Sequence, residues 1–94
     1  MEDLNRLRAE TDHIDRLMIE TLRDRFLVVS KIGKIKKIKN LSPLNKARWQ
    51  EVLVSRLAWA EELGVDKDFI KKVLDLIHKR SLEIEALEIE GHEK

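Results

Sequence analysis

The sequence contains no cysteine and no tyrosine, and its 94 residues include one proline, three glycines, two tryptophans and two phenylalanines. Without cysteine, the chain forms no disulfide and no thiolate metal site, and it has no thiol nucleophile. Few glycines and prolines also mean few of the turns that separate the strands of a sheet. The composition therefore predicts an all-α protein.

A strong net charge and long apolar runs are absent as well. Charged residues make up 39% of the chain, but the formal net charge is only +1, so no overall field favours nucleic acid or an anionic membrane as a partner. No stretch approaches the ~20 apolar residues of a membrane span, and the N-terminal stretch MEDLNRLRAE is too polar for a signal peptide. We expect a single domain over residues 1–94, located in the cytoplasm and bound to neither nucleic acid nor membrane.

Two short segments divide the chain into three predicted helices. In the first segment, Asn40 suits a helix C-cap, and Ser42 followed by Pro43 suits an N-cap and the first turn of the next helix. In the second segment, Gly64 can end a helix in the left-handed conformation, and Asp66 can cap the helix that follows. The predicted helices cover residues 3–39, 43–63 and 67–90.

The first predicted helix is too long for a compact monomer. About 37 residues at 1.5 Å each span about 55 Å, whereas a compact domain of this size has a radius of gyration near 13 Å. Apolar residues recur along it at spacings of three and four, which is typical of a helix packed along its length. Because the two shorter helices cannot cover this face, a second copy of the chain is the simplest cover, and we predict an intertwined helical homodimer. The apolar residues are Leu4, Leu7, Ile14, Met18, Leu22, Val29 and Ile32.

Charged residues interrupt the apolar face of the first helix. At alternating spacings of four and three, the face includes Arg8, Asp15, Arg25 and Lys36. The Cα atoms of Arg25 and Lys36 should lie about 16 Å apart on one side of the helix, and the two side chains can lean together to leave a gap about one small anion wide. Arg8 lies about 25 Å from Arg25 along the helix, so it could reach that site only across an antiparallel dimer.

The other two predicted helices bring further polar residues to the same region. Arg48 lies early in the second helix, and Ser81 and Glu85 lie one turn apart in the third. Helix bundles build ligand sites between facing helices, and a buried cation is costly without a partner. The pattern predicts a pocket for a compact dianion. The alternative is that each cation pairs with an acid such as Asp15 or extends into solvent.

Three stretches of the chain resemble a known family in the same order. The first stretch, LRAETDHIDRLMIETLRDRFLVVSKIGKIK, is similar to the pattern L-R-x-x-I-D-x-I-D-x-x-[IL]-x-x-L-x-x-R with I-G-x-x-K after it. The other two, RWQEVLVSRLAWAEELGVD and FIKKVLDLIHKRSLEIE, continue the likeness. Over essentially the whole chain, the sequence resembles the all-helical chorismate mutases of the AroQ type. Its second half most resembles relatives fused to DAHP synthase, the first enzyme of the shikimate pathway, so association with DAHP synthase is a further expectation.

The resemblance implies an activity and a set of site residues. Such enzymes convert chorismate to prephenate by an intramolecular Claisen rearrangement, with no covalent intermediate and no cofactor. By position, Arg25 and Lys36 match the cations of the same chain, and Arg8 matches the arginine donated across the dimer. Arg48 matches the arginine of the second helix, and Ser81 matches the hydroxyl of the third. The arginines would clamp two carboxylates, and Lys36 would stabilise negative charge on the ether oxygen as its C–O bond breaks.

Three residues depart from the family pattern. Glu85 replaces the glutamine that is the second donor to the ether oxygen, and because a carboxylate donates only when protonated, our hypothesis is that Glu85 must be neutral for full activity. Trp49 replaces a glutamate that binds the ring hydroxyl of the substrate, and Asn45 replaces an aspartate but can still hydrogen-bond. The simplest interpretation of Trp49 is packing with Leu53 and Leu57 at helical spacing.

Other interpretations stay open. His13, His78 and His92 lack the spacing of paired metal ligands, so we expect no metal, and we expect His78 to be a surface or hydrogen-bonded helix residue. The lysines between residues 31 and 39 could mark a nucleic-acid or membrane-surface helix, although such a run is usually a solvated face. An isochorismate-pyruvate lyase has a similar fold and cationic pocket, and the chain could also be a non-catalytic dimerisation or regulatory module.

Overall fold

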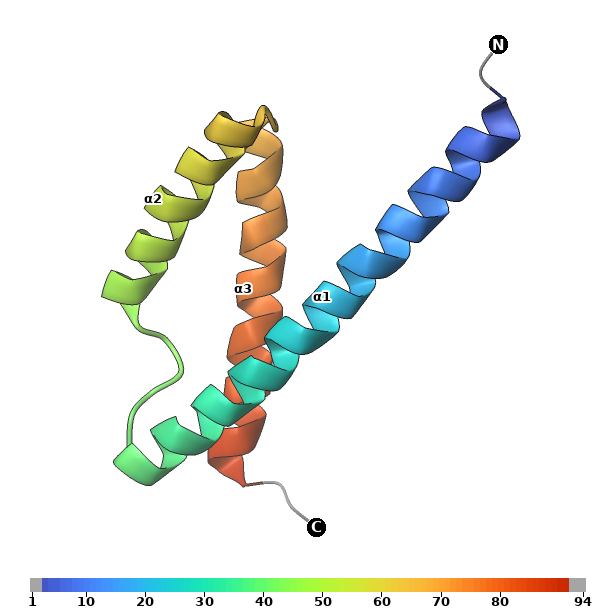
Figure 1. Cartoon of the computed structure of the whole chain (residues 1–94). Helices are drawn as coiled ribbons and strands as arrows, with labels where there is room; N and C mark the ends of the chain where they lie inside the picture. Colours follow the sequence, from blue (N-terminus) through green and yellow to red (C-terminus); the bar gives the residue numbers. More distant parts are fainter. Residues whose placement is uncertain (1–2, 92–94) are drawn as a thin grey trace.

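The computed structural model describes residues 3–91, and within that range the chain is folded into helices without strands. Helix α1 spans Leu4–Lys39, α2 spans Lys46–Leu63 and α3 spans Lys67–Glu90 (Figure 1). The predicted all-α, three-helix chain is confirmed. His92, which the sequence places near the C-terminus, lies outside the described residues.

Local capping interactions fix most of the helix ends where the sequence predicts them. Asn40 ends α1 in the left-handed conformation at φ 61°, and Gly64 ends α2 in the same way at φ 74°. These are the conformations that asparagine and glycine adopt at least cost. At the start of α3, the Asp66 side chain accepts a hydrogen bond from the backbone N–H of Phe69 at 2.8 Å. Each cap therefore satisfies a backbone group that the helix itself leaves unpaired.

The start of α2 differs from the prediction. The helix begins at Lys46, three residues later than expected, and its N-cap is Asn45, whose side chain accepts from the backbone N–H of Arg48 at 3.0 Å. Ser42 is not the N-cap. Its hydroxyl instead donates to the carbonyl of Leu44 at 3.2 Å. Asparagine is about as good an N-cap as serine, so Asn45 can take the role that the sequence predicts for Ser42. Pro43 consequently lies in the connecting loop.

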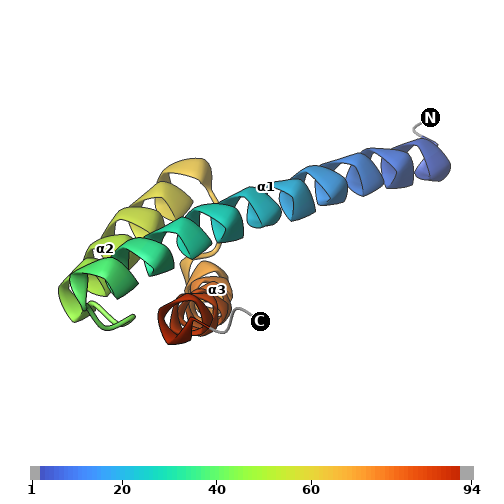
Figure 2. The same ribbon diagram turned by 90° about the horizontal axis from the view of Figure 1, so that it is seen from below.

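The three helices form an open arrangement. Helix α3 contacts both α1 and α2, while the N-terminal half of α1 projects away from the other two helices (Figures 1 and 2). The extents are 59 × 33 × 15 Å and the radius of gyration is 16.9 Å, above the ~13 Å of a compact domain of this size. None of the described helices is long and apolar enough to cross a membrane.

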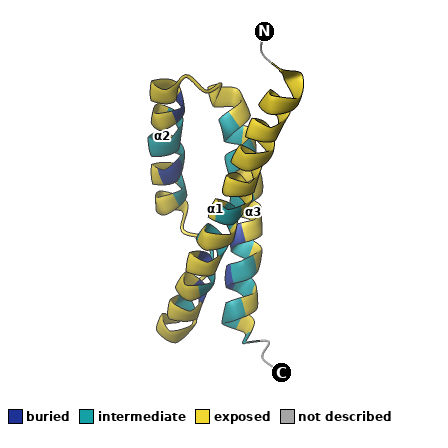
Figure 3. Ribbon diagram, turned by 45° about the vertical axis from the view of Figure 1, so that its right-hand side comes forward, coloured by how far each residue is buried: buried dark blue, intermediate teal, exposed yellow. Residues whose placement is uncertain are grey.

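The open shape leaves much apolar surface in solvent. Among residues 3–91 the buried hydrophobic residues are Val29, Val52 and Ala60, one on α1 and two on α2 (Figure 3). On the projecting half of α1, Leu4, Ile14 and Met18 are each more than half exposed. Exposed apolar surface on this scale is unusual for a soluble monomer and is typical of an interaction surface.

Gly33 allows α1 and α3 to cross closely. It is buried in α1, and a Cβ atom at this position would lie 2.9 Å from the Cβ of Glu88 and 3.0 Å from the Cα of Glu85. Real side chains do not approach so closely, so glycine is required by the backbone of α3 rather than by its own dihedral angles. Nearby, the Ser30 hydroxyl donates to the Glu88 carboxylate at 2.6 Å and joins the same two helices. The crossing thus fixes the position of Glu85 relative to α1.

Candidate active site

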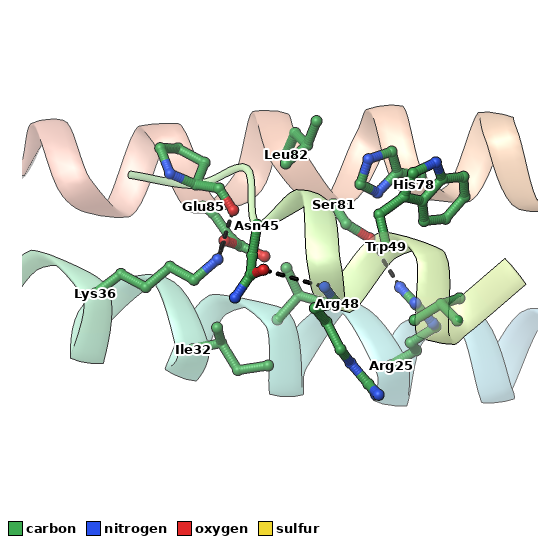
Figure 4. Close-up of a pocket in the computed structure, with 13 residues that line it drawn as sticks. Arg25, Ile32, Lys36, Asn45, Arg48, Trp49, His78, Ser81, Leu82 and Glu85 are labelled. Carbon is green, nitrogen blue, oxygen red and sulfur yellow. Dashed lines mark hydrogen bonds and ion pairs between the residues drawn. The ribbon is translucent and has the colours of Figure 1, made fainter. Parts of the chain in front are cut away.

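A cavity of about 220 Å³ lies between the C-terminal half of α1, the start of α2 and the middle of α3 (Figure 4). Drug-sized ligands usually occupy pockets of about 300–1,000 Å³, so this cavity suits a smaller ligand. Three cations and one carboxylate line it, which gives a net double positive charge when all four are ionised. The charged residues are Arg25, Lys36, Arg48 and Glu85.

Lys36 and Glu85 form an ion pair at one end of the cavity. The Lys36 ammonium lies 2.7 Å from the Glu85 carboxylate, and both side chains are largely buried, at 17% and 10% exposure. The same ammonium also donates to the carbonyl of Pro43 in the loop before α2. Three segments of the chain therefore hold one positive charge in place, and a buried charge of this kind needs such partners.

Arg25 lies on the same face of α1 as Lys36. Its guanidinium donates to the Ser81 hydroxyl at 2.8 Å, and within residues 3–91 no carboxylate forms an ion pair with it. Burial lowers the pKa of Arg25, and the positive charges of Arg56 and Arg48 act in the same direction, while Glu85 opposes them. Arginine stays protonated in proteins, so Arg25 is a half-buried cation without a carboxylate counterion, and an anion in the cavity would relieve that cost.

The N-terminus of α2 brings Asn45 and Arg48 to the cavity. The Arg48 side chain is 59% exposed and lies 3.3 Å from Glu51, so it is only loosely held. The Asn45 side-chain oxygen is engaged as the N-cap of α2. Both residues line the cavity, as the sequence predicts. Asn45 also caps α2, a role that the comparison with the family's aspartate did not reveal.

Trp49 and His78 form a stacked pair of rings that also lines the cavity. Their ring centroids lie 3.8 Å apart and their planes are inclined by 10°. The interpretation of Trp49 as a residue packed with Leu53 and Leu57 did not include this contact. Sequence reasoning also set His78 aside, although the spacing of His78, Ser81 and Glu85 places all three on one face of α3 and could have revealed it.

Arg8 lies apart from this cavity in its own chain. It is exposed on the projecting half of α1, in agreement with the expectation that it cannot reach Arg25 along the same helix. Asp15, the acid considered as its partner, forms no ion pair with it in the described structure. The structure therefore gathers seven of the eight predicted site residues around one cavity and leaves Arg8 outside it. The seven are Arg25, Lys36, Asn45, Arg48, Trp49, Ser81 and Glu85.

Comparison with known proteins identifies the family of this chain. Residues 7–86 match the family described as chorismate mutase type II. The chain is 36% identical over 74 residues to the T-protein of Haemophilus influenzae, which covers 79% of this chain and 20% of that protein. It is 32% identical over 79 residues to the T-protein of Enterobacter agglomerans, covering 84% of this chain and 21% of that protein.

The chain belongs to the chorismate mutase type II family. The family resemblance predicted from the sequence is confirmed by this match. The chain spans about a fifth of the length of the curated relatives that it matches. The family match by itself does not assign a role to any single residue.

Proposed function

We propose that this cavity binds chorismate and rearranges it to prephenate. The observation that carries the proposal is Arg25, a half-buried guanidinium whose side-chain partner is a hydroxyl, in a cavity with a net double positive charge. Chorismate carries two carboxylates, so the cations of the cavity can neutralise its charge. Arginine is well suited to bind a carboxylate through two parallel hydrogen bonds.

The reaction needs orientation and charge stabilisation rather than a nucleophile. One ether C–O bond breaks and one C–C bond forms within the same molecule, and no proton or electron leaves it. Arg25 and Arg48 would hold the two carboxylates so that the enolpyruvyl group lies over the ring, which reduces the entropy lost on reaching the transition state. Ser81 would orient the Arg25 guanidinium through its hydrogen bond.

Lys36 would stabilise the ether oxygen as negative charge develops on it. The Lys36 ammonium is already held by Glu85 and by the Pro43 carbonyl, so it requires little reorganisation when the C–O bond breaks. Glu85 would act as the second donor to the same oxygen once it is protonated, because only the protonated carboxyl can donate.

A second copy of the chain would complete the site. It would cover the exposed apolar face of α1 and bring its own Arg8 to the cavity of the first chain, as predicted for an intertwined homodimer. Trp49 and Asn45 would contact the substrate from α2 in addition to their structural contacts. A single domain over residues 1–94, a cytoplasmic location and association with DAHP synthase also remain predictions.

The test is to follow chorismate loss and prephenate formation with purified protein and three variants. Lys36→Ala should lower kcat at least about 100-fold, because it removes the main stabilisation of the ether oxygen. Arg25→Ala should lower kcat/KM by about 10- to 100-fold, because it removes a charge-assisted contact. Lys34→Ala, at an exposed position on the same helix, is the matched control and should behave like the parent.

Two outcomes would overturn the proposal. Activity that survives both Arg25→Ala and Lys36→Ala unchanged would mean that the cavity is not the reaction site. Release of pyruvate from isochorismate, with no conversion of chorismate, would instead identify the lyase that shares this fold.

A further inference from the structure

A pair of stacked rings forms one end of the cavity. His78 on α3 lies face to face with Trp49 near the start of α2, with a centroid distance of 3.8 Å. Two helical turns, about 10 Å, separate His78 from Glu85 along α3, and Figure 4 shows His78 at the end of the cavity opposite to Lys36. Such stacking restricts the ring to one orientation, so the imidazole is held in place at the cavity wall.

The hydrogen-bonding atoms of His78 are uncommitted in the described structure. No hydrogen bond to or from its imidazole is found within residues 3–91. By contrast, the Ser81 hydroxyl accepts from Arg25 and donates to a carbonyl of its own helix, and the Asn45 side-chain oxygen serves as the N-cap of α2. Among the neutral polar side chains that line the cavity, His78 and Trp49 are thus the two without a hydrogen bond within residues 3–91, and of these only the imidazole can both donate and accept.

The surroundings of the imidazole also favour its neutral form. Burial lowers the pKa of His78 below its usual range, and the charge of Arg25 acts in the same direction, whereas Glu85 and Asp75 oppose the shift. A neutral imidazole offers one N–H donor and one nitrogen acceptor. It is therefore suited to an uncharged hydroxyl, which can both accept and donate, rather than to a carboxylate.

On the basis of the proposed function, we propose that His78, held by Trp49, binds the ring hydroxyl of chorismate and selects substrates that carry it. Chorismate presents two carboxylates, an ether oxygen and one hydroxyl. The arginines suit the carboxylates, and Lys36 with Glu85 suits the ether oxygen, so the hydroxyl is the polar group that remains. Isochorismate carries its hydroxyl on a different ring carbon, so a fixed imidazole would also favour chorismate over isochorismate.

The experiment compares two substrates in the parent and in His78→Phe. Phenylalanine can keep the stack on Trp49 but has no ring nitrogen. One substrate is chorismate, and the other is its analogue with hydrogen in place of the ring hydroxyl. We expect His78→Phe to lower kcat/KM for chorismate by about three- to ten-fold, the value of one hydrogen bond, and to leave kcat/KM for the analogue unchanged.

The controls separate this inference from the proposed function. If the parent does not convert chorismate, the proposed function fails. If the parent converts chorismate but His78→Phe affects both substrates equally, or neither, the role of His78 is wrong and the proposed function stands. Should His78→Phe fold poorly, nitrogen NMR of the parent gives the answer, because prephenate should shift the His78 ring resonances and the product of the analogue should not.

Discussion

At the scale of single residues, the ion pair between Glu85 and Lys36 makes a prediction about pH. In the free protein Glu85 accepts a hydrogen bond from Lys36 at 2.7 Å, whereas donation to the ether oxygen would require its protonated form. We therefore expect kcat/KM of the parent to fall as the pH rises. Glu85→Gln should remove this alkaline loss, because an amide donates at any pH. An equal alkaline loss in both proteins would refute the requirement for a neutral Glu85.

His78 makes a prediction about stability. Its pKa is lowered in the folded protein by burial, whereas the unfolded chain should titrate near pH 6.5. Between these values the unfolded chain binds more protons, so the contribution of His78 to stability is present above about pH 6.5 and is lost as the pH falls. Urea unfolding at about pH 7.5 and about pH 5.5 should show a larger loss for the parent than for His78→Phe. Equal losses would mean that His78 is not half-buried as the structure has it.

Residue types and spacing predicted the charged part of the site but not its aromatic part. Arg25 and Lys36 stand out in the sequence because cations interrupt an apolar face, and a buried cation requires an explanation. Trp49 and His78 give no such signal, because aromatic residues on helices most often pack in a core. Only the relative placement of α2 and α3 shows that their rings meet at the cavity.

At the scale of helices, the caps were predictable and the loop before α2 was not. Asn40, Gly64 and Asp66 each have one plausible role, and each performs it. Ser42 was the expected N-cap because Pro43 follows it, but the Asn45 side chain accepts a capping hydrogen bond equally well. The later start has a consequence for the site, because it leaves the Pro43 carbonyl free to accept from Lys36.

The crossing of α1 and α3 makes a prediction about Gly33. In Gly33→Ala the new Cβ would meet the Cα of Glu85 at 3.0 Å, so the backbone of α3 must move. Overpacking costs about 1–3 kcal/mol, and the better helix propensity of alanine returns about 1 kcal/mol, so we expect a net loss of up to about 2 kcal/mol. Displacement of Glu85 should also lower kcat, which the chorismate assay measures.

The neighbouring residue supplies the control for Gly33. Lys34→Ala changes an exposed position of the same helix and should alter stability by no more than about 0.5 kcal/mol. Denaturant unfolding of the two variants beside the parent measures both effects. If Gly33→Ala proved more stable than the parent by the ~1 kcal/mol that alanine gains from helix propensity alone, the helices would not cross as closely as the structure has them.

At the scale of the whole molecule, the open shape could be anticipated from helix length alone. A helix of 36 residues cannot be covered by partners of 18 and 24 residues in the same chain. The sequence therefore predicted both the projecting half of α1 and its need for a cover. What the sequence could not give is the partner's arrangement, because a periodic apolar face fits more than one register and direction of a second helix.

The proposed homodimer makes a prediction about complementation between subunits. If Arg8 acts in the partner's cavity, Arg8→Ala and Lys36→Ala should each be nearly inactive alone. A dimer containing one chain of each variant would have one cavity with both residues intact and one with neither. Co-folding equal amounts should therefore restore about a quarter of the parent's sites, since about half of the dimers are mixed and one of their two cavities is intact.

A second mixture tests whether this recovery depends on which chain supplies each residue. Arg25 and Lys36 come from the same chain, so in a dimer of Arg25→Ala with Lys36→Ala each cavity lacks one of them. That mixture should show no recovery, although its subunits associate in the same way. Recovery in the second mixture would show that Arg25 and Lys36 of one chain do not serve the same cavity, and its absence in the first would show that Arg8 does not cross between chains. The projecting half of α1 would then serve assembly without contributing to the active site.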